Sequence, residues 1–174
     1  MDYIEACIRT IPDFPKKGIM FRDITTLLSN PKAFNLTCLK LKSEYQWKEI
    51  NYVAGIEARG FIFGSVLARD IGAGFIPIRK KGKLPGKTIS EEYKLEYGTD
   101  EIEIDADTLE KGDKVLIIDD LLATGGTARA ACNLIENTGA EVIECAFVVE
   151  LPRLRGRHKL KNKKVFSLIM FEGE

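Results

Sequence analysis

The segment that most constrains the fold of this chain runs from Val115 to Thr127 and reads VLIIDDLLATGGT. It begins with four consecutive apolar residues, and such a run without alternation is typical of a parallel strand covered on both faces. Two carboxylates, Asp119 and Asp120, follow directly, so we expect them to emerge at the carboxyl end of that strand. Open α/β sheets bind their ligands at this end. The segment therefore predicts an α/β fold with a ligand site at residues 119–127.

The turn that follows the carboxylates suits an anion. Residues 123–127 are small or carry hydroxyls, and a helix is predicted over 126–138. The first N–H groups of a helix are unpaired and lie at the positive end of its dipole, so they bind phosphate well. An ordinary strand–turn–helix with solvated acids is the alternative, although adjacent carboxylates on a buried strand are costly unless they bind something. A Walker A loop is excluded, since no Gly-Lys-Ser/Thr follows.

Length and composition limit the other possibilities. With 174 residues the chain is long enough for one domain and short for two, so we expect a single domain over 1–174. No apolar stretch approaches the roughly 20 residues of a membrane helix, and the chain starts with acidic residues, unlike a signal peptide. We therefore predict a cytoplasmic protein without a membrane partner. The 26 basic and 26 acidic residues speak against nucleic-acid binding, and the four cysteines lack CxxC spacing, so we expect them to be reduced.

Hydrophobic periodicity predicts the remaining elements. We expect strands at 52–56, 74–78, 141–149 and 165–171, and helices at 2–9, 33–45 and 60–70. Trp47 is expected to cap the helix at 33–45 against the sheet. Alternating residues from Tyr93 onward and at 102–104 predict a β-hairpin flap.

Two basic segments need an explanation. Five of the nine residues at 79–87 are basic, which fits either a solvated loop or a loop that closes over pyrophosphate, where it would exclude water and neutralise charge. The run at 153–164 lacks interleaved aromatic residues, so we interpret it as a solvated face rather than a nucleic-acid patch.

Residues 115–127 resemble the phosphoribosyl pyrophosphate (PRPP) binding motif of the type I phosphoribosyltransferases, and the similarity extends from Pro12 to about Val149. It implies the fold of that family: a central, mainly parallel sheet flanked by helices, with a β-hairpin flap and an N-terminal hood segment. It also implies transfer of the phosphoribosyl group from PRPP to a base. Mg²⁺ would be held mainly by the substrate and water, with no protein metal ligands, and a homodimer is expected.

The resemblance also assigns roles by position. Ribose 5-phosphate is expected at Asp119, Asp120, Ala123, Thr124, Gly125, Gly126 and Thr127. Pyrophosphate is expected at Glu57, Ala58, Arg59, Gly60, Lys80 and Lys83, with a non-proline cis peptide between Glu57 and Ala58. The expected catalytic residues are Arg59, Lys83, Glu96 and Tyr97. Glu96 would manage the proton of the base when the flap closes, and Tyr97 would help to position it.

Ala123 favours adenine as the base. In the 6-oxopurine enzymes of this family an Asp at this position handles the N7 proton, which Ala123 cannot do. An apolar slot with peptide groups suited to an exocyclic amine is expected from the adenine-binding set Met20, Phe21, Arg22 and Leu121, although the Phe21–Arg22 segment could equally serve packing alone. Two rival functions stay open: a phosphoribosyltransferase for another base, and a PRPP-binding regulator without activity.

Overall fold

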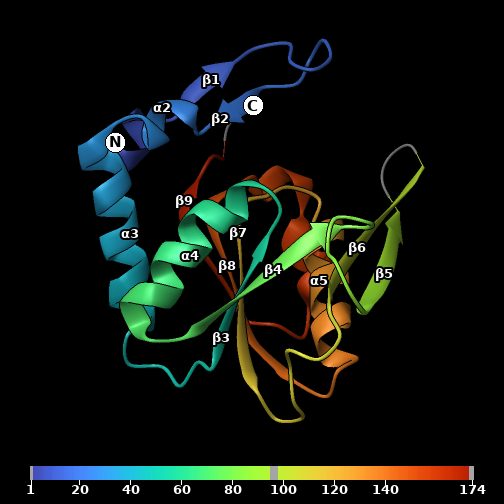
Figure 1. Ribbon diagram of the computed structural model, residues 1–174. Helices are drawn as coiled ribbons and strands as arrows, with labels where there is room; N and C mark the ends of the chain where they lie inside the picture. Colours follow the sequence, from blue (N-terminus) through green and yellow to red (C-terminus); the bar gives the residue numbers. More distant parts are fainter. Residues whose placement is uncertain (1, 95–97, 173–174) are drawn as a thin grey trace.

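The computed structural model describes residues 2–94 and 98–172. Its main sheet has the strand order β5-β6-β4-β3-β7-β8-β9 (Figure 1). The parallel strands are β3 (Tyr52–Ile56), β4 (Gly74–Lys80), β7 (Lys114–Leu122), β8 (Glu141–Glu150) and β9 (Val165–Met170). An antiparallel hairpin, β5 (Thr88–Lys94) and β6 (Thr99–Asp105), joins through the end of β4. The predicted mainly parallel sheet with a hairpin flap is confirmed.

β7 lies between β3 and β8, and its two faces are both covered. Val115 and Ile117 belong to the core on the side of α5 (Gly126–Glu136), whereas Leu116 and Ile118 belong to the core on the opposite side, with α3 (Pro31–Tyr45) and α4 (Arg59–Ile71). All four side chains are fully buried. A strand that is covered on both faces needs no polar alternation, which explains the continuous apolar run.

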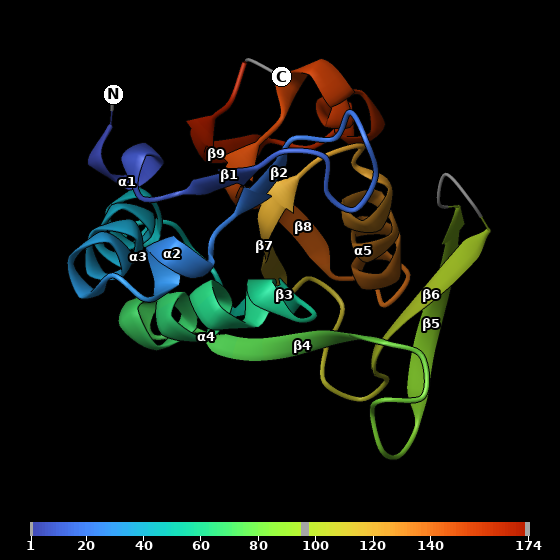
Figure 2. The same cartoon turned by 90° about the horizontal axis from the view of Figure 1, so that it is seen from above.

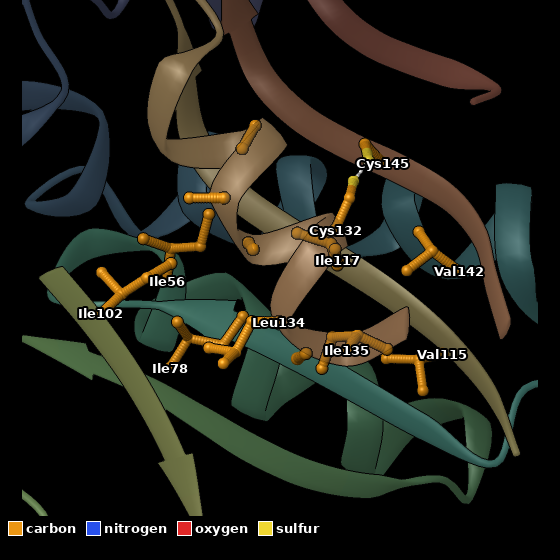
Figure 3. Close-up of a cluster of buried hydrophobic side chains, with 14 of the residues drawn as sticks. Ile56, Ile78, Ile102, Val115, Ile117, Cys132, Leu134, Ile135, Val142 and Cys145 are labelled. Atoms are coloured by element: carbon orange, nitrogen blue, oxygen red, sulfur yellow. Dashed lines mark hydrogen bonds between the residues drawn. The ribbon is translucent and has the colours of Figure 1, made fainter. Parts of the chain in front are cut away.

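On the α5 side of the sheet, helix side chains pack directly on the strands. Figure 3 shows Leu134 beside Ile78 and Ile135 beside Val115. The helix that begins at the anion turn is therefore fixed to the sheet along its length, and the position of its N-terminus is fixed with it.

α4 lies close to the sheet because glycines face it. A Cβ atom at Gly64 would lie 2.8 Å from Ile118 Cγ2, and one at Gly60 would lie 2.7 Å from the Ile118 carbonyl oxygen. Neither distance is tolerated in a packed structure, so these positions exclude larger side chains. The close approach brings the start of α4 against Asp119 at the carboxyl end of β7.

The N-terminal region forms a separate small ribbon. After α1 (Tyr3–Ala6), β1 (Arg9–Ile11) pairs antiparallel with β2 (Phe21–Asp23), and α2 (Thr25–Leu28) follows. Seen from above, the ribbon and its loop cross over the end of β7, as expected of a hood (Figure 2). The helix predicted over 2–9 was too long, because Arg9 instead enters the ribbon and pairs with Asp23.

Two other local predictions were wrong. β7 continues to Leu122, so Asp119 and Asp120 lie within the strand rather than after it. Trp47 is 89 % exposed and does not pack on the sheet; at the end of α3 the Lys48 ammonium lies over the Tyr45 ring instead. The run at 153–164 exposes most of its basic side chains, as expected, but it also contains two short 3₁₀ helices, η1 (Pro152–Leu154) and η2 (Gly156–Leu160), and Gly156 and Leu160 of η2 are buried.

The elements predicted at 33–45, 52–56, 60–70, 74–78, 126–138, 141–149 and 165–171 begin and end within two residues of the observed ones. The hairpin strands begin earlier than predicted, at Thr88 and Thr99, and β1 beyond Arg9, β2 and α2 lie in a stretch where no element was predicted. Three of the four cysteines are buried and all are free thiols. Within residues 2–94 and 98–172, no helix combines the length and the apolar character needed to cross a membrane.

Candidate active site

A small cavity of about 90 Å³ lies in the turn between β7 and α5. Gly125 makes this turn possible, since its φ of 75° lies in the left-handed region that favours glycine. α5 begins at the next residue, so its free N–H groups belong to the same turn. The lining residues are Asp119, Leu121, Leu122, Ala123, Thr124, Gly125, Gly126, Thr127 and Ala128. Every residue predicted for ribose 5-phosphate except Asp120 is therefore brought to this cavity.

A larger cavity of about 530 Å³ adjoins the first one, because Asp119 and Thr127 line both. Its walls come from the ends of β3, β4 and β7 and from the hairpin. The lining residues are Ile56, Glu57, Ala58, Arg59, Lys80, Tyr93, Asp100, Asp119, Asp120 and Thr127. Most residues predicted for pyrophosphate line it. Gly60 lies behind them, against β7, and Lys83 is not among the lining residues.

The peptide between Glu57 and Ala58 is cis, as expected. The Glu57 carboxylate accepts hydrogen bonds from the Lys80 backbone N–H (3.0 Å) and from Arg79 Nε (3.2 Å). Burial opposes charge on Glu57, yet these hydrogen bonds leave its pKa below the ordinary value. Glu57 thus fastens the loop at 57–60 to β4 and holds Arg59 at the edge of the cavity.

Two adjacent carboxylates dominate the floor of the larger cavity. Asp120 is 4 % exposed, and Arg59 Nε lies 2.7 Å from its Oδ2. Burial raises the pKa of Asp120, although the Arg59 charge opposes this shift. Burial raises the pKa of Asp119 well above its ordinary value, and the neighbouring Asp120 raises it further. A ligand that offers hydroxyl donors, or a cation, would therefore favour the ionised form of this pair.

Two residues of the hairpin, Tyr93 and Asp100, line the larger cavity although the sequence analysis assigned them no role there. Asp100 Oδ2 lies 3.0 Å from Lys80 Nζ, and the Tyr93 hydroxyl lies 3.3 Å from the same oxygen. The alternating pattern that begins at Tyr93 places this side chain on one face of the flap strand, and that was a signal for its position at the cavity. For Asp100 the sequence carried no signal, because its contact with Lys80 depends on the pairing of β6 with the end of β4.

Lys83 is exposed, and its backbone N–H donates to the buried carboxylate of Glu103. The same carboxylate accepts hydrogen bonds from the Leu84 N–H and the Thr88 hydroxyl, so Glu103 fixes the basic segment at 79–87 to β6. Glu96 and Tyr97, expected to act in catalysis, lie outside the described residues.

The predicted base-binding segment lies beside Arg59. The Arg59 guanidinium is 6.0 Å from the centre of the Phe21 ring, which also contacts Phe14 edge-on at 5.1 Å. The Arg22 side chain turns elsewhere: it lies 4.3 Å over the Phe171 ring and hydrogen-bonds Thr10.

The other two residues of this set are half-buried. Met20 immediately precedes β2, and Leu121 lies on β7 and lines the smaller cavity. Asp23, at the end of β2, forms an ion pair with Arg9. Phe21 therefore lies beside Arg59 and the Arg22 side chain is engaged in packing, while Met20, Phe21 and Arg22 are not among the lining residues of the two cavities.

The turn at η2 supports the phosphate-sized cavity from behind, which the sequence reading missed. Gly156 packs tightly on the backbone of Ala123 and Gly125. A Cβ atom at Gly125 or at Gly156 would lie closer than 3.0 Å to an atom of the other segment. Next to it, Arg157 makes two hydrogen bonds of 2.7 Å to the buried carboxylate of Glu150. In the sequence, Gly156 within the basic run at 153–164 was the signal that could have indicated this contact.

Comparison with known proteins bears on the identity of this arrangement. Residues 27–173 match the model of the phosphoribosyl transferase domain. The chain is 58 % identical to the adenine phosphoribosyltransferase of Chlorobium luteolum over 98 % of its own length and 99 % of that protein's. It is 56 % identical to adenine phosphoribosyltransferase 4 of Arabidopsis thaliana, covering 98 % and 94 % of the two chains.

Solved structures give the same picture. An adenine phosphoribosyltransferase from Thermoanaerobacter pseudethanolicus superimposes with a TM-score of 0.93 at 50 % identity, covering 97 % of this chain and 98 % of the other. The Giardia lamblia APRTase, solved with 9-deazaadenine, superimposes with a TM-score of 0.92 at 40 % identity, covering 98 % and 97 %.

Proposed function

The chain belongs to the phosphoribosyl transferase family, and we propose from its site how it carries out the reaction of the adenine-specific members. The enzyme transfers the 5-phosphoribosyl group from PRPP to adenine and releases AMP and pyrophosphate. One observation carries the proposed site: a cavity of phosphate size at a helix N-terminus adjoins a larger cavity that is lined by two basic side chains, Arg59 and Lys80, and by the adjacent carboxylates Asp119 and Asp120.

The 5′-phosphate is assigned to the smaller cavity. Thr124 and Thr127 supply hydroxyls, and the first N–H groups of α5 supply donors at the positive end of the helix dipole. Asp119, which lines both cavities, and Asp120, which lines the larger one, accept hydrogen bonds from the ribose hydroxyls. Their raised pKa values fit this role, because two hydroxyl donors stabilise charge that burial otherwise disfavours.

The pyrophosphate is assigned to the larger cavity, beside Arg59 and Lys80. A guanidinium is suited to two parallel hydrogen bonds with phosphate oxygens. The carboxylate oxygens of the cavity suit Mg²⁺. Because Mg²⁺ keeps several waters and binds substrate phosphates readily, we assign the ion chiefly to PRPP oxygens and water. When bound with PRPP, Mg²⁺ supplies positive charge that offsets the charge on the departing pyrophosphate.

Adenine is assigned to the slot between the hood and β7, formed by the backbone at 20–22 and by Leu121. In the reaction, N9 of adenine forms a bond to the anomeric carbon while the bond from that carbon to pyrophosphate breaks. Glu96 takes the proton that the base gives up, and Tyr97 positions Glu96. Catalysis rests mainly on orientation and on charges fixed before the reaction begins.

We propose further that residues 1–174 act as one unit and that two copies form a homodimer, the commonest symmetric assembly. A cytoplasmic location is consistent with four free cysteines, which stay reduced there. Light scattering of the purified protein tests the dimer, since a monomer mass would reject it.

The replacement Glu96→Gln tests the proposed chemistry. It keeps the shape of the side chain but cannot take a proton, so kcat should fall by about 10²- to 10⁴-fold while the dissociation constant of PRPP stays within about twofold. Glu92→Gln is the matched control, because Glu92 is an exposed carboxylate on the same hairpin that does not line the larger cavity. Unchanged turnover in Glu96→Gln would reject Glu96 as the acid/base group.

A further inference from the structure

Both cations that line the larger cavity are paired with carboxylates of the chain itself. Arg59 Nε lies 2.7 Å from Asp120, and Lys80 Nζ lies 3.0 Å from Asp100. The two carboxylates differ in their surroundings. The Asp120 side chain is 5 % exposed and lies within β7, whereas the Asp100 side chain is 25 % exposed and lies on the hairpin strand β6.

Asp100 is held in the cavity by three donors. Its Oδ2 faces Lys80 Nζ and the Tyr93 hydroxyl, and its Oδ1 accepts from the Glu101 backbone N–H at 2.9 Å. The Lys80 hydrogen bond is the main reason that the pKa of Asp100 lies below its ordinary value. A fixed negative charge therefore faces the ammonium group to which the pyrophosphate is assigned.

An anion in this cavity meets an unfavourable balance of charge. The acidic side chains that line it are Glu57, Asp100, Asp119 and Asp120, against the two basic groups of Arg59 and Lys80. Glu57 is engaged by Arg79 and by the Lys80 backbone, and the Asp119–Asp120 pair is assigned to ribose. Among the described residues, Asp100 is the lining carboxylate that is assigned no part in holding the substrate, and its partners are Lys80 and the hairpin itself.

We propose that Asp100 competes with pyrophosphate for Lys80 and thereby sets the affinity of the enzyme for PRPP and pyrophosphate relative to AMP. This inference rests on the proposed assignment of pyrophosphate to Lys80. A ligand with a pyrophosphate group must share or displace the Lys80–Asp100 pair, whereas AMP has no group at that position. After the transfer step, the same carboxylate reclaims Lys80 and favours release of the pyrophosphate.

Binding measurements on Asp100→Asn test the competition. In isothermal titration calorimetry with Mg²⁺, PRPP and inorganic pyrophosphate should bind to Asp100→Asn about two- to fivefold more tightly than they bind to the wild-type enzyme. This is the range expected for removing a partly exposed ion pair. The affinity for AMP should stay within twofold. Asn keeps the shape of the side chain and can still accept the hydrogen bond from the Glu101 N–H. Thermal unfolding checks that the variant is folded. Asp100→Ala is a second variant for which the same change in affinity is expected.

Glu101→Gln is the matched control. Glu101 is the next residue on β6, and its carboxylate pairs with Lys81 at 2.8 Å, but neither residue lines the cavity. This variant removes one negative charge and one lysine ion pair from the same strand. The affinities for PRPP and pyrophosphate should therefore remain at the wild-type values.

Lys80→Ala separates failure of this inference from failure of the site assignment. Weaker pyrophosphate binding in Lys80→Ala, with no gain in Asp100→Asn, would overturn the competition and leave the assignment intact. Unchanged pyrophosphate binding in Lys80→Ala would overturn both. If the competition is real, Asp100→Asn has no effect on pyrophosphate affinity once Lys80 has been removed, and an undiminished effect would contradict it.

Discussion

Gly156→Ala should damage PRPP binding although Gly156 is assigned no contact with PRPP. Its new Cβ atom would lie 2.8 Å from Leu122 Cδ1 and closer still to the Ala123 carbonyl oxygen, whereas ordinary contacts begin near 3.4 Å. φ at Gly156 lies outside the left-handed region, so the substitution tests steric contact rather than backbone strain. Either the turn at η2 or the phosphate turn must move.

The magnitude follows from overpacking and from misplacement. Extra volume in a packed region costs about 1–3 kcal/mol. For a chain of this size, each kcal/mol lowers the melting temperature by roughly 2–4 °C. A shift of the phosphate turn by about 1 Å can cost up to 100-fold in rate, because the 5′-phosphate orients the whole substrate. We expect kcat/KM for PRPP to fall at least about tenfold, and the KM for adenine to change much less.

Steady-state kinetics and thermal unfolding of Gly156→Ala provide the assay. Leu154→Ala is the control, because Leu154 is 48 % exposed in the preceding turn and touches neither cavity. Wild-type kinetics for PRPP together with a wild-type melting temperature would refute the account of η2 as the support of the phosphate turn.

Two further predictions concern charged residues. Arg59→Ala should lower kcat by about 10²- to 10³-fold, because the variant loses the guanidinium assigned to pyrophosphate and leaves the buried Asp120 unpaired; normal steady-state kinetics would count against this assignment. Hydrogen bonds from Thr25 and Arg9 lower the pKa of Asp23 from 3.8 to about 2. A lowered acid pKa stabilises the fold above the unfolded value, so the stability contributed by Asp23 should be lost as the pH falls from about 4 toward 2. Urea unfolding at pH 5 and pH 2.5 should show a smaller loss for Asp23→Asn than for the wild-type protein, and equal losses would contradict this reading.

Much of the framework could be predicted because local signals agree with the tertiary structure. The apolar run at 115–118 marks a strand covered on both faces, and the turn at 123–127 marks the start of a helix. Both signals depend on residues adjacent in sequence, and the structure places them as expected. The hairpin could also be predicted, because alternating residues mark part of each of its two strands.

The parts that could not be predicted depend on contacts between distant segments. Gly156 supports the phosphate turn more than thirty residues away in sequence, and Asp100 meets Lys80 only because β6 pairs with the end of β4. Trp47 shows the converse, since its apolar character suggested burial while its position in a surface turn leaves it exposed. Single-sequence patterns do not record such pairings.

The most direct test of the central claim is a panel of bases assayed with PRPP and Mg²⁺. Initial rates would be measured by absorbance for adenine, hypoxanthine, guanine, xanthine and orotate at matched concentrations. The account predicts that adenine is converted to AMP with a kcat/KM at least about 100-fold above that of any other base, because Ala123 cannot handle the N7 proton of a 6-oxopurine. Faster conversion of hypoxanthine than of adenine would contradict it.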